Sequence, residues 1–429
     1  MTTEAIPTPP APLAPPAAAE DGAELDLLLP LRSAGTLDDP YPIYSLMRTV
    51  RPVLPVPVPD WDGPGFWILT RYEDVLHVLR DPRFSADRLK SPLVQQNLER
   101  MPPFLRQSAE GMRSMLVMDP PDHTRLRKLV NKAFTPKRIA ALRPHIEELV
   151  DRLVSDAVEA GAFDLIHDIA EPLPAIVIAE LLGVPPSDHR QFREWSGALI
   201  AVAGNPDPSL QAAGAEASQN LLGYLGETIA ERRRAPREDL ISAMVQAQEA
   251  GDQLSDLELL ATSNLLLLAG HETTTNLIGN GMLALMCERD EWARLCADPA
   301  LVDPAVEELL RFDPPVQATV RSAAEDVELG GQTIEAGSLV MVNIGAANRD
   351  PAAFDEPDRL DLGRTPCNHL SFGFATHFCM GAPLARLEGQ AVFSALSQRM
   401  PGVTMPVDDP CYRPNPILRG LKRLDLVAG

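Results

Sequence analysis

The residues with the clearest chemical potential surround Cys379. The stretch Phe372 to Gly381 reads FGFATHFCMG, a loop of small and aromatic residues just before an amphipathic helix predicted over Ala385–Leu396. A cysteine at a helix N-terminus feels the positive end of the dipole, and nearby N–H groups lower its pKa, so we predict a thiolate. Such a thiolate suits a soft metal or haem iron. The alternative is a buried structural cysteine.

A second pair of chemical groups lies in the centre of a long helix. Ser255 and Glu258 form a capping box, and the apolar pattern that follows predicts a helix to about Cys287. Its segment 265–270 is apolar on every side, which predicts burial. Glu272 and Thr273 follow directly, and a buried acid and hydroxyl need partners or water. Gly270 is a plausible place for this helix to open; the alternative is a tolerated glycine beside ordinary hydroxyls.

Two further motifs pair charged side chains along a helix. Glu308 and Arg311 are three residues apart, a spacing that is also common on solvated surface helices. His123 and Arg127 are four residues apart, where two cations would repel, so an anion between them is expected. A solvated cationic face is the alternative interpretation of the second motif.

Together these motifs resemble those of the cytochrome P-450 family of haem-thiolate monooxygenases. The family's cysteine loop is F-x-x-G-x-[H/R]-x-C-x-G, and Phe372, His377, Cys379 and Gly381 match it. Ala375 replaces the expected glycine, which adds a Cβ where the backbone turns. The resemblance implies the cytochrome P-450 fold, a triangular helical prism that is mainly α with a small β-sheet subdomain.

The resemblance also implies a role for each candidate site residue. Cys379 is expected to bind the iron of haem b. Thr273 is expected to hold the oxygen undergoing activation, and Glu272 to help relay protons from solvent. The expected haem-propionate residues are His123, Arg127, Arg321 and His377, and the expected scaffold of the cysteine loop is Glu308, Arg311 and Arg359. Expected substrate-pocket residues are Leu266, Ala269, Gly270, Val316, Ala318 and Thr319.

The implied reaction inserts one oxygen atom from O2 into an apolar organic substrate of secondary metabolism, by hydroxylation or epoxidation. No second redox module fits within 429 residues, so electrons are expected from a separate ferredoxin and an NAD(P)H-dependent ferredoxin reductase. Residues 123–138 hold six cations and no acid, which predicts a docking face for an acidic partner or, equally, a solubilising helix face. A peroxide-driven peroxygenase and a non-catalytic haem-binding sensor are the alternative functions.

Composition narrows the class of protein. The chain is 45% hydrophobic and 23% charged, with a net charge of -22 that argues against nucleic acid as a partner. Its five cysteines include no C-x-x-C pair, which argues against a disulfide framework or zinc ribbon. No apolar run suggests a membrane span and no signal peptide is evident, so we expect a cytoplasmic protein.

The remaining pattern predicts the elements that position these residues. Residues 1–30 are rich in Pro and Ala and are expected to form a flexible tail, whereas 31–429 are expected to form one domain. Expected elements are a helix at Tyr41–Met47, a strand at Phe66–Thr70, a helix carrying Val75 to Leu79, a hairpin of Val327–Leu329 and Gln332–Ile334 about Gly330-Gly331, and a strand at Ser338–Asn343.

Overall fold

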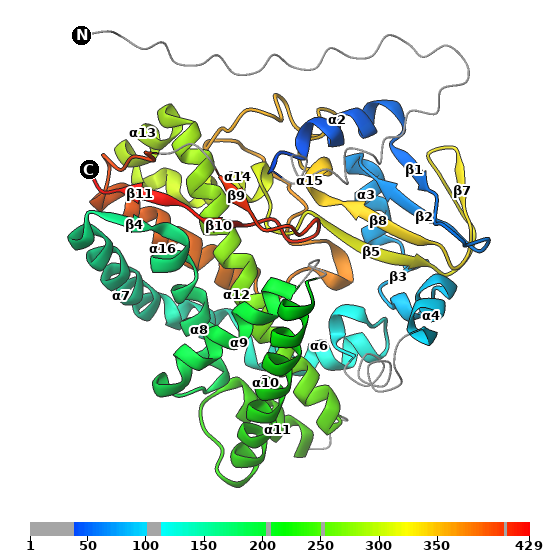
Figure 1. The fold of residues 1–429 in the computed structure, drawn as a ribbon, viewed down its shortest axis with the longest axis horizontal. Coiled ribbons are helices and arrows are strands. Elements are labelled where there is room, and N and C mark those ends of the chain that lie inside the picture. Colours follow the sequence, from blue (N-terminus) through cyan, green and yellow to red (C-terminus); the bar gives the residue numbers. More distant parts are fainter. Residues whose placement is uncertain (1–37, 101–112, 203–206, 250–253, 407–409) are drawn as a thin grey trace.

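The computed structural model describes residues 38–100, 113–202, 207–249, 254–406 and 410–429, so the expected tail at 1–30 lies outside the described residues. Helices dominate the chain, and a small sheet lies at one side of them (Figure 1). The prediction of a mainly α fold with a small β subdomain is confirmed.

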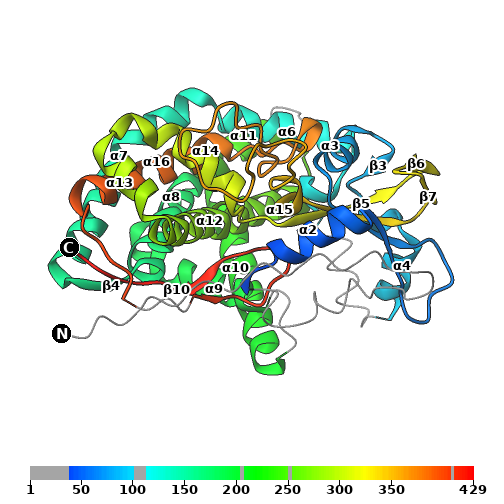
Figure 2. The same ribbon diagram turned by 90° about the horizontal axis from the view of Figure 1, so that it is seen from above.

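The helices share one arrangement, in which most pack around the long helix α12 (Figures 1 and 2). Their bounds are α2 (Tyr41–Val50), α3 (Tyr72–Arg80), α4 (Pro92–Glu99), α6 (Asp122–Ala133), α7 (Pro136–Ala160), α8 (Pro172–Leu182), α9 (His189–Val202), α10 (Pro208–Arg234), α11 (Leu240–Glu249), α12 (Asp256–Cys287), α13 (Arg289–Ala297), α14 (Val302–Phe312), α15 (Ile344–Ala347) and α16 (Ala382–Arg399). Short 3-10 turns include η2 (Arg88–Lys90), η3 (Met115–Val117) and η7 (Ala375–His377).

The main sheet joins strands that are far apart in sequence. Its order is β1 (Val53–Val56), β2 (Phe66–Leu69), β8 (Leu339–Asn343), β5 (Ala318–Ala323) and β3 (Phe84–Ser85). The hairpin of β6 (Val327–Leu329) and β7 (Gln332–Ile334) forms where predicted, and Gly330 and Gly331 both have positive φ. Two smaller sheets pair β9 (Cys411–Tyr412) with β10 (Leu421–Arg423) and β11 (Asp425–Val427) with β4 (Ala162–Asp164).

Helix α12 begins where the sequence predicts, because the Ser255–Glu258 capping box forms in both directions. It is buried along most of its length, and the predicted burial of segment 265–270 is confirmed for only part of that segment. Ala269 is exposed and Gly270 is half-buried, whereas Leu266 and Leu267 are buried. One face of the helix centre is therefore accessible in the middle of the protein.

Helix α14 holds both sides of the cysteine loop. The Ser371 hydroxyl, before Cys379, donates to the Leu310 carbonyl at 2.7 Å. After the loop, Arg386 donates to both carboxylate oxygens of Glu307, at 2.6 and 2.8 Å. The backbone that carries Cys379 is thus attached to α14 at two points.

The neighbouring Glu308 binds the segment between α15 and the cysteine loop. The side chains of Glu308 and Arg311 are fully buried and joined by two hydrogen bonds of 2.7 and 2.8 Å. The second arginine on Glu308 is Arg364, whose Nε lies 3.0 and 3.1 Å from the two carboxylate oxygens. Removing a charged partner from such a pair is costly because the remaining charge stays buried.

The prediction that Arg359 supplies this second arginine is wrong. Its side chain is 58% exposed and pairs with Glu356 at 3.0 Å. Only its backbone carbonyl belongs to the network, because it accepts from Arg311 and Arg364, at 3.2 Å each. The chain turns between the two arginines, so the residue five positions later reaches Glu308.

Replacement of Arg364 by Met tests this correction. We expect Arg364→Met to lower the free energy of unfolding by about 3 kcal/mol, because it leaves part of a buried carboxylate unpaired. Arg359→Met, the matched control, should change it by about 0.5 kcal/mol or less, because surface pairs contribute little. Denaturant unfolding followed by circular dichroism measures both. Equal losses in the two variants would contradict the assignment.

Candidate functional site

Cys379 lies at the end of the loop that enters α16. Its backbone N–H donates to the Phe372 carbonyl at 2.8 Å, which closes the loop upon itself. Two guanidinium N–H groups of Arg127, from α6, donate to the Thr376 and Phe378 carbonyls at 3.1 and 2.6 Å. The loop is therefore held from within and by α6.

The predicted low pKa of Cys379 is wrong for the protein chain itself. Burial among protein atoms raises the pKa of the thiol, and this effect exceeds the opposing hydrogen bonds from the backbone N–H groups of Gly381 and Ala382. Arg127 and Arg386 also lower the pKa by smaller amounts. Nevertheless, the two backbone N–H groups that donate to the Cys379 sulfur suit a thiolate. Cys379 also retains exposed surface, so its sulfur is available as a ligand.

Ala375 adopts the conformation that favours glycine. Its φ is +52°, in the left-handed region, whereas Gly373 nearby has φ +69°. A Cβ in this region costs about 1–2 kcal/mol. The loop accommodates this strain at the position where the sequence departs from the family pattern.

The four predicted propionate residues gather above this loop from three parts of the chain. The rings of His123, from α6, and His377, from η7, have centroids 4.2 Å apart. Burial is the largest cause that lowers the pKa of His377 to about 4, with Arg321 as the next contribution. Burial and then Arg127 lower the pKa of His123. Both imidazoles are therefore neutral hydrogen-bonding groups at pH 7.

This cluster fits a ligand that carries carboxylates. His123 is 2% exposed, yet its Nδ1 has no hydrogen-bond partner among the described residues. Arg321 is buried, and among the described residues its side chain donates hydrogen bonds only to Thr319 Oγ1 and the Val320 carbonyl, at 3.3 and 3.1 Å. Buried cations and orphaned imidazole nitrogens are stabilised by anions, so the residues fit the two propionates of a haem.

The centre of α12 carries the predicted acid and alcohol, of which Glu272 is buried and Thr273 is half-buried. Thr273 donates to the Ala269 carbonyl at 2.7 Å, which confirms that a hydroxyl binds a backbone carbonyl here, although the segment remains helical. Burial raises the pKa of Glu272 to about 7, against a smaller lowering by Arg413. A carboxyl group with this pKa both accepts and releases protons near neutral pH.

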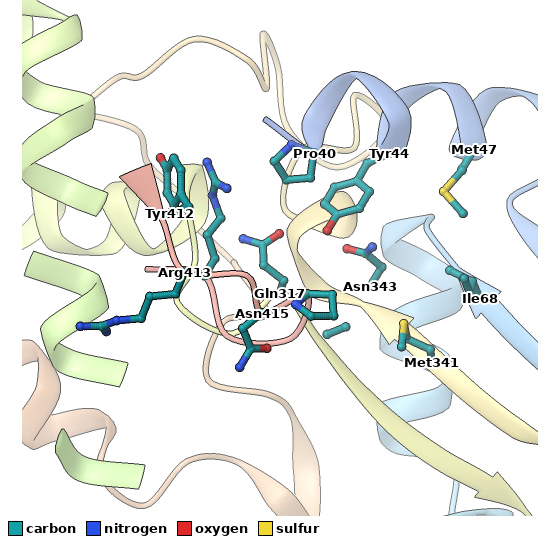
Figure 3. Close-up of a pocket in the computed structure, with 13 residues that line it drawn as sticks. Pro40, Tyr44, Met47, Ile68, Gln317, Met341, Asn343, Tyr412, Arg413 and Asn415 are labelled. Carbon is teal, nitrogen blue, oxygen red and sulfur yellow. The ribbon is translucent and has the colours of Figure 1, made fainter. Parts of the chain in front are cut away.

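The six predicted pocket residues come from two separate segments of the chain. Leu266, Ala269 and Gly270 share α12, whereas the other three belong to the segment 316–319 that begins β5. Ala318 lines a cavity of about 150 Å³ between α2, the main sheet and the C-terminal segment (Figure 3). There the amide groups of Gln317 and Asn343 lie beside Tyr44. Val316 and Thr319 are half-buried and do not line it.

Two further functional candidates, Glu388 and Arg88, were not predicted from the sequence. Glu388, in α16, is 1% exposed, and burial raises its pKa to about 8 against a smaller lowering by Thr274 of α12. The sequence signal that could have identified Glu388 is an acid on the apolar face of the α16 helix. Arg88, in η2, has a buried Nε without a hydrogen-bond partner among the described residues. No periodicity or motif marks Arg88.

The raised pKa of Glu388 predicts a pH-dependent stability. Because the pKa of Glu388 in the folded protein lies above its ordinary value of 4.5, the contribution is fully present below pH 4.5 and is lost as the pH rises towards 8. Glu388→Gln should remove a slope of up to about 1.4 kcal/mol per pH unit in that window. Unfolding midpoints measured from pH 4.5 to 8.5 provide the test, with Glu335→Gln, an exposed acid, as control. An unchanged slope in Glu388→Gln would refute the prediction.

Comparison with known proteins agrees with this geometry. The Cytochrome P450 family model matches residues 65–423. The chain is 42% identical to the vitamin D(3) 25-hydroxylase of Pseudonocardia autotrophica, over 91% of this chain and 94% of that protein. It is 43% identical to the cytochrome P450 monooxygenase PikC of Streptomyces venezuelae, over 90% of this chain and 91% of that protein.

The fold is similar to solved structures as well. The bacillaene polyketide synthase cytochrome P450 PksS of Bacillus subtilis 168 superimposes with a TM-score of 0.83 and 37% identity, over 92% of this chain and 98% of that one. No helix of the described residues is long and apolar enough to cross a membrane. By sequence, fold and the arrangement around Cys379, the chain belongs to the bacterial cytochrome P450 monooxygenases, a family of haem-thiolate oxidoreductases that includes hydroxylases of secondary metabolism.

Proposed function

We propose that this enzyme inserts one atom of O2 into an apolar small molecule of secondary metabolism, with haem b bound by Cys379. The observation that carries the proposal is an accessible Cys379 in a loop whose His377 lies against His123 and beside the buried Arg321, a cluster that fits carboxylates. Haem b has both an iron that takes a thiolate and carboxylates that suit the cluster. We further propose that residues 31–429 act as one domain, which the match to 65–423 supports.

The cofactor supplies activation of O2 and transfer of one oxygen atom to the substrate. The residues around this cofactor orient it and protect it. Arg127 and Arg321 bind carboxylates, while neutral His123 and His377 donate hydrogen bonds without adding charge. Backbone N–H groups at the start of α16 stabilise negative charge on the Cys379 sulfur.

Proton delivery is assigned to the acid and alcohol of α12. Glu272, with a pKa of about 7, can accept a proton and release it at working pH. The Thr273 hydroxyl has its hydrogen on the Ala269 carbonyl, which leaves its oxygen lone pairs to accept from water or from the reacting oxygen.

An apolar substrate is supported by the residues expected to face it. Leu266, Ala269, Val316 and Ala318 offer hydrocarbon surface, and Thr319 one hydroxyl. The similar proteins named above include a vitamin D(3) hydroxylase and PikC, and a related solved structure holds testosterone. A polycyclic or macrocyclic substrate of low polarity is the class that we propose.

The electron donor that we propose is a ferredoxin, reduced by an NAD(P)H-dependent reductase. On α6 and the start of α7, Lys128 and Lys137 have exposed side chains in a chain of net charge -22. Arg125 is less available, because it pairs with Glu258 at 2.5 Å. The exposed lysines therefore supply the positive charge of a docking face near the cysteine loop that Arg127 contacts.

The carbon monoxide difference spectrum of the dithionite-reduced holoprotein tests the haem-thiolate assignment. We expect a strongly red-shifted Soret band, because an anionic sulfur donates electron density to the iron. Cys379→Ser should lose this band, whereas Cys367→Ser should keep it, since Cys367 lies beside Glu308 instead of in the loop. Retention of the red-shifted band in Cys379→Ser would disprove Cys379 as the ligand.

Reduction kinetics test the docking face. Lys128→Glu combined with Lys137→Glu should slow reduction by a [2Fe–2S] ferredoxin about tenfold at low ionic strength, with a smaller effect at high salt. Lys422→Glu, a reversal of an exposed charge elsewhere, serves as the control. Stopped-flow formation of the carbon monoxide complex gives the rate. If the double variant matched the control, the docking face would lie elsewhere.

A further inference from the structure

Arg88 is a partly buried guanidinium for which the described residues provide no carboxylate. It lies in η2, immediately after β3, which pairs with the end of β5 through Ser85 and Ser322. This pairing brings Arg88 near Arg321, one residue before Ser322, and the charge of Arg88 lowers the pKa of Arg321. Like-charged groups brought together in the interior are costly unless an anion lies between them.

The nearby acids are already committed to other cations. Asp87 pairs with Arg113 at 2.7 Å. Asp119 pairs with Lys90 at 2.6 Å and also accepts from the Ser85 hydroxyl and from the Ala86 N–H at 2.9 Å. Asp119 still attracts Arg321 electrostatically, but no hydrogen bond joins them among the described residues. The acids therefore leave Arg88 and Arg321 without a direct carboxylate partner.

The remaining groups on neighbouring elements are cationic or neutral. Arg127 donates to two backbone carbonyls of the cysteine loop, and the neutral rings of His123 and His377 lie against each other. Arg88 thus extends a site in which Arg321 has no carboxylate partner, and His123 Nδ1 no hydrogen-bond partner, among the described residues. A planar guanidinium binds a carboxylate through two parallel hydrogen bonds, so a carboxylate is the ligand chemistry that it fits.

We propose that Arg88 is a carboxylate-binding residue of the haem-containing site, beyond the four residues assigned from the family pattern. The carboxylate comes from one of two sources, a propionate of haem or an acidic group on the substrate. The inference rests on the proposed haem-thiolate function, and the proximity of Arg88 to Arg321 makes both sources reachable.

The experiment uses the holoprotein and three variants. Arg88→Gln removes the charge, Arg88→Lys retains it without the planar fork, and Arg83→Gln removes an exposed arginine that pairs with Asp81 on the surface. The reduced carbon monoxide spectrum and circular dichroism first confirm that each variant folds and binds haem. If Arg88→Gln fails to fold, Arg88→Lys is used in its place for both measurements.

The first measurement is the rate at which ferric haem transfers to apomyoglobin. If Arg88 binds a propionate, Arg88→Gln should release haem at least about tenfold faster, because a hydrogen bond to a charged group is lost. Arg88→Lys should show a smaller change. Loading with haem dimethyl ester should remove the difference between native protein and Arg88→Gln.

The second measurement is the Soret shift on titration with dodecanoic acid and with 1-dodecanol. If Arg88 binds a substrate carboxylate, Arg88→Gln should weaken the binding of dodecanoic acid at least about tenfold. The affinity for 1-dodecanol should stay within about twofold of that of the native protein. A change in either measurement supports the proposal and identifies the source. If Arg88→Gln behaves like Arg83→Gln in both, the proposal is overturned.

Failure of the proposed function gives a different result. A native chain that shows no red-shifted carbon monoxide band would refute haem-thiolate ligation, whatever Arg88 does. Calorimetric titration of the native chain and Arg88→Gln with dodecanoic acid would then still decide whether Arg88 binds a carboxylate. Equal affinities in that titration would overturn the inference about Arg88.

Discussion

Two adjacent carboxylates on α14 hold the reactive part of this protein together. Glu308 binds Arg311 and Arg364 in the interior, while Glu307 binds Arg386 at the start of α16 and His369 before the cysteine loop. Burial makes the two Glu308 pairs sensitive to the loss of either partner. The attachment of Cys379 thus depends on charges that lie away from the sulfur itself.

The charge of the site is opposite in sign to the net charge of the chain. A protein of net charge -22 concentrates guanidinium and imidazole groups above the cysteine loop, and burial then lowers the pKa of His377 to about 4. Neutral imidazoles reduce the repulsion between cations and still donate hydrogen bonds. This combination explains how cations are tolerated in the interior, and why carboxylates are the fitting ligands.

Helices α12 and α16 contact each other and carry the acids that titrate near neutral pH. Glu272, on α12, is 6% exposed and has a pKa of about 7, and Glu388, on α16, is 1% exposed beside Thr274 and has a pKa of about 8. Burial raises the pKa of both carboxyl groups. Of the two acids, only Glu272 has a pKa that is also lowered by a cation, Arg413. Arg413 in turn pairs with Glu171 towards the surface.

Local features were determined by the sequence alone. The capping box of α12, the Gly330-Gly331 hairpin and the order of the chemical motifs depend on neighbouring residues, so pattern and spacing identified them. The tertiary structure decided what depends on burial and on distant partners: Arg364 instead of Arg359 on Glu308, the raised pKa of Cys379, and the isolation of Arg88. These outcomes could not be read from the sequence, because desolvation and long-range charge arise only when remote segments pack together.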